Sequence, residues 1–198
     1  VNLALAEREN QLAGVRHRKA ASDRLAALAP LAGGEFLVNC LRFATACGFS
    51  PRLRLDLVLN DFVASALATG RIEILSDGTP WRPLIHVEDM ARAIEWAITR
   101  PASAGGPQLV ANVGANDWNY RIRELAETVQ AELGGVEVDI NTEAAPDKRS
   151  YQVDFSYYAS LAPKNVPQMT LPQAVAGLRK GLLLSARARR RAGCPHNL

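Results

Sequence analysis

Residues 77–94 read DGTPWRPLIHVEDMARAI and pass through a turn, a strand and the start of a helix. Residues 77–80 have turn composition, because Asp, Gly and Pro each favour the backbone angles of tight turns. The apolar run 81–87 predicts a short strand that leads directly into a helix. Glu88 and Asp89 stand in its first turn, where carboxylates suit the helix dipole. The apolar residues that share one helix face are Val87, Met90, Ala91, Ile94 and Ile98.

Strand and helix patterns alternate along the rest of the chain. Residues 36–43 and 108–113 are rich in apolar side chains, as expected of parallel strands buried on both faces. The other expected elements are helices over 4–29, 59–67, 122–133 (capped by Asn119), 155–161 and 172–186, and strands over 72–74, 136–140 and 151–153. This alternation predicts an α/β or α+β layered domain.

Composition excludes several classes of protein. With 198 residues, 48% of them hydrophobic, and a net charge of +3, the chain matches a soluble globular domain and not a disordered one. No apolar run approaches the ~18 residues of a membrane span, and charge appears early, so we expect a cytoplasmic protein with no membrane partner. Three cysteines in no CxxC pattern indicate reduced thiols and no metal site. The arginine-rich residues 187–198 lack interleaved aromatic residues and predict a solvated basic tail, not a nucleic-acid site.

Several ordered motifs resemble the NAD-dependent epimerase/dehydratase family, the extended short-chain dehydrogenases. They are LRF at 41–43, PRLRLDLVLN at 51–60, the stretch at 77–94, NVG at 112–114, IRELA at 122–126 and RSYQVDFS at 149–156. The resemblance covers roughly residues 20–181 and concerns the second half of such enzymes only.

This resemblance implies an α/β fold with two parts. Segments 1–56 and 101–134 would form the remnant of a Rossmann-like parallel sheet from the nucleotide-binding domain. Segments 57–100 and 135–186 would form the small α+β substrate-binding domain.

Two features that the family uses for hydride transfer are missing from this sequence. It contains no GxGxxG or GxxGxxG turn to hold a dinucleotide pyrophosphate. In the window that matches the family's Tyr-x-x-x-Lys pair, Lys19 is present but Val15 replaces the tyrosine that would act as the base. We therefore expect no NAD(P) site in this chain alone, and NAD(P) only if a partner supplies the missing half. Because the cofactor turn and the tyrosine are lost together, we expect a naturally shortened homologue, with Val1 as a GTG start read literally, and not a cut fragment.

The resemblance also implies a substrate site for a nucleotide sugar. Arg82 and Arg149 resemble the family's diphosphate-binding arginines, and a guanidinium fork suits two phosphate oxygens. The segment that the family places over its substrate supplies three further candidates, Arg52, Arg54 and Asn60, and Thr45 falls where the strand after Arg42 would face the cofactor and substrate in a complete enzyme.

Two other residues could take part in acid–base or nucleophilic chemistry. His86 could move a proton, but we expect it to tie the strand to the following helix, with Asp89 as its partner at the helix start. Cys47 is expected to be a buried, inert thiol.

Three functional hypotheses follow. The chain is the substrate-binding half of an epimerase/dehydratase-like enzyme; or a repurposed, cofactor-independent isomerase, lyase or cyclase; or a non-catalytic binding or scaffold protein. Whether it is an enzyme stays open. Because a reduced parallel sheet leaves an open edge, we expect a homo-oligomer or a partner chain that buries residues 4–43.

Overall fold

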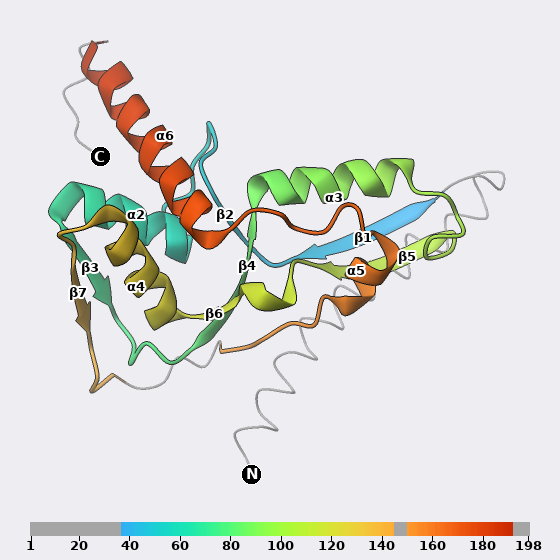
Figure 1. The fold of residues 1–198 in the computed structure, drawn as a ribbon, viewed down its shortest axis with the longest axis horizontal. Helices are drawn as coiled ribbons and strands as arrows, with labels where there is room; N and C mark the ends of the chain where they lie inside the picture. The colour runs from blue at the N-terminus through green and yellow to red at the C-terminus, as the bar shows by residue number, and fades with distance from the viewer. Residues whose placement is uncertain (1–36, 145–149, 192–198) are drawn as a thin grey trace.

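The computed structural model describes residues 37–144 and 150–191, with side chains described as far as residue 186. The expected helix over 4–29, with Val15 and Lys19, lies outside these ranges, as does Arg149. In chain order the elements are β1 (Val38–Phe43), β2 (Thr45–Cys47), α2 (Val58–Thr69), β3 (Arg71–Ile74), β4 (Trp81–His86), α3 (Val87–Thr99), β5 (Gln108–Val113), η2 (Asn116–Trp118), β6 (Asn119–Arg121), α4 (Ile122–Leu133), β7 (Glu137–Ile140), α5 (Ser156–Leu161) and α6 (Leu171–Arg191) (Figure 1).

The two apolar segments predicted as parallel strands pair with each other. β1 and β5 run parallel in a register from Val38 opposite Gln108 to Phe43 opposite Val113. Leu109, Ala111 and Val113 of β5 are buried, because α3 and α5 cover that face. The structure thereby confirms the α/β class and a small parallel sheet.

β4 pairs with two other strands, one at each of its ends. Its C-terminal part pairs parallel with β2, and its N-terminal part pairs antiparallel with β6. A third, separate pair is parallel: β3 lies beside β7, with Ile72 opposite Val138. Alternate residues of β3, Ile72 and Ile74, are buried, as the period of a strand requires.

The buried apolar residues form two clusters. The larger lies among α2, α4 and α6 over β3, and the smaller lies between α3, α5 and the β1–β5 pair (Figure 1). α3 packs with β5 in the smaller cluster, whereas α4 packs with α2 and α6 in the larger one.

The apolar residues that the sequence places on one face of α3 do not all pack against the core. Ile94 and Ile98 are 45% and 77% exposed, whereas Asp89, Ala93, Trp96 and Ala97 are buried. The reason is that Asp89 has backbone partners inside the molecule: its carboxylate accepts hydrogen bonds from the N–H groups of Gln168 and Met169. This rotates the helix so that alanines, and not isoleucines, face the sheet.

Two further local predictions are corrected. Asn119 does not cap α4 but lies in β6, where its side chain both accepts from the Val153 N–H and donates to the Val153 carbonyl. Residues 151–153 do not form the predicted strand: the Tyr151 N–H donates to the Trp81 carbonyl and Val153 pairs with the Asn119 side chain, with no strand ladder assigned. The final helix also continues to Arg191, so the first residues of the predicted tail are helical.

Candidate substrate-binding site

Arg82 lies near the beginning of β4, beside an aromatic ring. Its guanidinium is 5.9 Å from the centre of the Tyr151 ring and donates a hydrogen bond of 2.8 Å to the Trp81 carbonyl. The Trp81 N–H donates to Ser150 Oγ at 3.0 Å, and the Tyr151 N–H donates back to the Trp81 carbonyl. Residues 150 and 151 are therefore anchored to the strand that carries Arg82.

A second guanidinium lies on the neighbouring strand. Arg121 of β6 is directly opposite Trp81, and its guanidinium is 5.0 Å from a ring centre of that tryptophan. Sequence reasoning singled out neither Arg121 nor Tyr151. Arg121 follows from the β4–β6 register, but Tyr151 is so distant along the chain from Arg82 that no local pattern identifies the pair.

The loop between β2 and α2 carries Arg52 and Arg54, and Asn60 holds this loop from inside. The buried Asn60 accepts a hydrogen bond from the Gly48 N–H through Oδ1 and donates to the Arg54 carbonyl through Nδ2, both at 3.0 Å. Arg52 is exposed. Arg54 forms an exposed ion pair with Asp56, and the hydrogen bond from Arg54 lowers the pKa of that carboxyl group.

His86 and Cys47 are both buried. His86 Nδ1 accepts a hydrogen bond from the Glu88 N–H and so caps α3, and burial lowers its pKa, against smaller opposing effects of Glu88 and Asp89. Burial, followed by the charge of Asp89, raises the pKa of Cys47 to about 12. Asp89 also pairs with Arg92. His86 thus ties the strand to the helix, whereas Asp89 bonds to the backbone at Gln168 and Met169 and to Arg92.

The register between β2 and β4 shows that the candidate binding residues lie at different positions along β4. Cys47 pairs with His86 and Thr45 with Leu84. The Arg52 loop therefore leaves β2 beside the C-terminal end of β4, whereas Arg82 lies four residues earlier, roughly 13 Å away at the rise of an extended strand. Thr45, half-buried, lies between the two. A ligand that contacted all three positions would have to be elongated.

A dinucleotide would need a strand-to-helix junction that accepts a pyrophosphate, and a metal ion would need a cluster of ligands. α3 directly follows β4, and its first turn carries Glu88 and Asp89, which would repel a pyrophosphate. This junction does not fit NAD. Within residues 37–144 and 150–191 there is no group of three His, Cys, Asp or Glu side chains that could hold a metal ion. No helix in these ranges is long and apolar enough to cross a membrane.

The model of the NAD dependent epimerase/dehydratase family matches residues 16–114. Among solved structures, MoeE5 in complex with UDP-glucuronic acid and NAD is 25% identical, with a TM-score of 0.62 over 77% of this chain and 49% of that one. A GDP-L-fucose synthetase from Naegleria fowleri is 16% identical, with a TM-score of 0.65 over 85% and 52% of the two chains.

A UDP-N-acetylglucosamine 4-epimerase from Methanobrevibacter ruminantium M1, in complex with UDP-N-acetylmuramic acid, is 20% identical, with a TM-score of 0.64 over 84% and 52%. The chain thus spans about half the length of these solved structures.

Proposed function

This chain belongs to the NAD dependent epimerase/dehydratase family, and from that premise we propose that it binds a nucleotide sugar, with Arg82 on the diphosphate. The observation that carries the proposal is the position of Arg82, held between the Trp81 carbonyl and the Tyr151 ring. A guanidinium fork can donate to two phosphate oxygens at once. Because an aromatic ring and a carbonyl already orient this fork, less side-chain entropy is lost when a phosphate binds.

The separation of the other candidates along β4 supports an elongated ligand. With the diphosphate at Arg82, the remainder of a nucleotide sugar can extend past Thr45 toward the loop of Arg52 and Arg54. Asn60 supports that loop from inside, so we assign it a positioning role. Arg149 directly precedes Ser150, which is anchored to Trp81, and we propose it as the second arginine on the diphosphate.

Binding without catalysis by His86 or Cys47 fits the site better than the repurposed-enzyme alternative. A general base needs access to its substrate and a pKa near the working pH. His86 is buried with its Nδ1 on the Glu88 N–H, and Cys47 is buried with a pKa of about 12. Neither residue is suited to transfer a proton at neutral pH.

The cofactor and assembly proposals follow from the same reasoning. We propose that this chain alone has no NAD(P) site, that it is cytoplasmic, and that a second copy or a partner covers the edge of β1. Calorimetric titration with NAD(H) and NADP(H) is expected to show no tight site, and micromolar binding would overturn the first point. Light scattering that reports a strict monomer would count against self-association.

A thermal-shift panel of UDP- and GDP-sugars tests the binding proposal. We expect a UDP- or GDP-sugar to raise the Tm of the wild-type chain, Arg82→Ala to abolish that rise, and Arg82→Lys to restore it only in part. Arg71→Ala is the matched control, since Arg71 is an exposed arginine that pairs with Asp139 in the β3–β7 sheet. If the stabilisation survives in Arg82→Ala, the diphosphate is not bound at this site.

A further inference from the structure

The last helix, α6, is longer than its contact with the core. It runs for 21 residues, and its buried side chains, Leu171, Ala174, Val175, Leu178 and Leu182, lie in its first part. Beyond Leu182 the helix projects from the body of the molecule (Figure 1). The second part of α6 is therefore not required for packing of the larger cluster.

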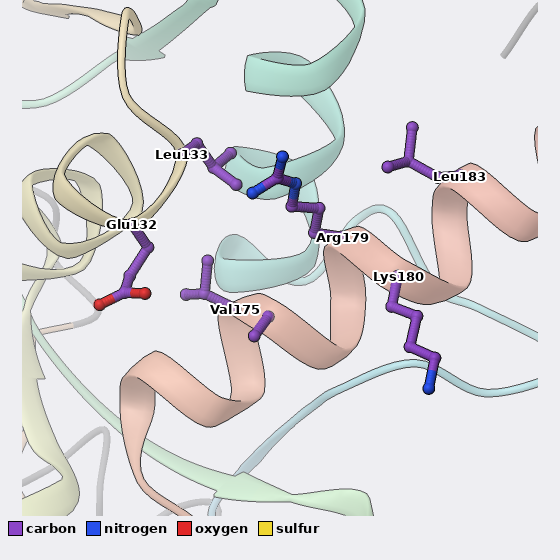
Figure 2. Close-up of a pocket in the computed structure, with 7 residues that line it drawn as sticks. Glu132, Leu133, Val175, Arg179, Lys180 and Leu183 are labelled. Atoms are coloured by element: carbon purple, nitrogen blue, oxygen red, sulfur yellow. The ribbon is translucent and has the colours of Figure 1, made fainter.

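The exposed side of α6 combines leucines with cations. Leu183 and Leu184 are 43% and 54% exposed, and neither packs in the core. Arg179 and Lys180, one turn earlier, are also exposed. A surface pocket of about 280 Å³ begins here, between α4 and α6, where Arg179, Lys180 and Leu183 line it on the α6 side (Figure 2).

The sequence of α6 extends this basic character to its end. The helix contains no Asp or Glu, and Arg187, Arg189, Arg190 and Arg191 follow the two leucines. Clusters of Lys and Arg on an amphipathic helix are attracted to anionic lipid headgroups, and flanking leucines can enter the boundary between headgroups and acyl chains. We propose that the C-terminal half of α6 is a docking surface for a membrane that carries anionic phospholipids. This is peripheral binding, which needs no spanning helix, and none is found among the described residues. The proposal revises the expectation of no membrane partner, because that expectation rested on the lack of a spanning run.

The leucines favour a lipid surface over other polyanions. A nucleic acid would pair with the cations but would gain nothing from Leu183 and Leu184, and the basic segment has no aromatic side chains for base stacking. Since the helix projects from the body, an extended surface can reach its end without meeting the rest of the protein (Figure 1).

Co-sedimentation of the full chain with vesicles tests the proposal. We expect binding to phosphatidylcholine vesicles that contain about 30% phosphatidylglycerol and none to pure phosphatidylcholine, because the attraction depends on anionic headgroups. Raising NaCl from about 0.1 to 0.5 M should weaken binding by about tenfold, since salt screens exposed charges. Failure to sediment with anionic vesicles at low salt, or equal binding to both vesicle types, would overturn the proposal.

Matched variants distinguish vesicle binding through this surface from non-specific adsorption of the protein. Leu183→Ser combined with Leu184→Ser should lower vesicle binding at least about fivefold, because two side chains no longer insert into the membrane. The control Leu75→Ser, which changes a leucine outside α6 that is 77% exposed, should leave binding unchanged. Arg179→Gln with Lys180→Gln should also weaken binding, whereas Arg71→Gln with Arg123→Gln should leave it unchanged. Circular dichroism melting confirms that each variant folds. The membrane proposal fails if the two leucine substitutions have no effect on vesicle binding. It also fails if RNA displaces the wild type and the double-leucine variant from vesicles equally well, because α6 then binds polyanions by charge alone.

Discussion

Replacing Asn60 by Ala is expected to loosen the loop that carries Arg52 and Arg54. The change removes the acceptor for the Gly48 N–H and the donor to the Arg54 carbonyl. Gly48 is buried, so its unpaired N–H costs about 1–3 kcal/mol, while the exposed Arg54 end costs roughly 0.5–1.5 kcal/mol because water can replace the donor. The free energy of unfolding should fall by about 1.5–4.5 kcal/mol, which lowers the Tm by roughly 3–18 °C for a chain of this size.

Two measurements check this prediction. Urea unfolding gives the change in stability, and limited digestion with trypsin reports the loop directly, since trypsin cleaves after arginine. Native Asn60→Ala should be cut after Arg52 or Arg54 faster than the wild type. Asp61→Ala is the control, because exposed Asp61 accepts only a 3.4 Å hydrogen bond from Ser65. A loss below about 0.5 kcal/mol, with unchanged cleavage, would refute the view that Asn60 holds the loop.

The other predictions concern residues around α3. Asp89→Ala should lower the free energy of unfolding by about 3–5 kcal/mol, because it removes the acceptor of the Gln168 and Met169 N–H groups and the partner of Arg92; a urea-measured loss under about 1 kcal/mol would contradict the assigned contacts. Cys47, with its pKa raised to about 12, should resist iodoacetamide at pH 8 in the folded state and react in urea, as peptide mass spectrometry can show; rapid labelling of native Cys47 would argue against its burial. For His86, burial lowers the folded-state pKa below the unfolded value of about 6.5, so the unfolded state takes up the proton first and stability should fall as pH drops below that value. His86→Asn, which keeps an acceptor for the Glu88 N–H, should flatten this dependence in urea titrations at several pH values.

The sequence was sufficient for the class and for the longer elements, but not for the three-residue strands β2 and β6. Continuous apolar runs identified β1 and β5 as parallel strands, and the turn–strand–helix at 77–94 placed β4 and α3. These features depend on local composition and period, which a single sequence records directly.

Long-range polar contacts explain the local errors. The periodicity of α3 favoured Ile94 and Ile98, but its orientation is set by Asp89 and the backbone at Gln168, 79 residues away. Asn119 has the composition of a helix cap, yet its amide pairs with Val153, 34 residues distant. Nothing in the local sequence identifies such partners.

Only part of the candidate site was predictable from the sequence. The resemblance supplied Arg82 as a candidate, but the Tyr151 ring beside it comes from a segment joined to β4 through Ser150. Asn60 was expected on the substrate, and its two amide contacts instead indicate how the loop is held. The sequence therefore indicates candidate residues, but only the tertiary structure shows which groups they contact.

Isothermal titration of the full chain with a UDP-sugar tests the central claim most directly. Arg82 is half-buried, and the loss of its cation–π contact with Tyr151 and of its hydrogen bond to the Trp81 carbonyl should together cost roughly 1–2.5 kcal/mol of stability, so Arg82→Ala is expected to fold and can be titrated beside the wild type. The account predicts saturable binding by the wild type that weakens by at least about tenfold in Arg82→Ala, the loss expected when charge-assisted hydrogen bonds to a diphosphate are removed. Equal affinity in the two proteins would contradict it.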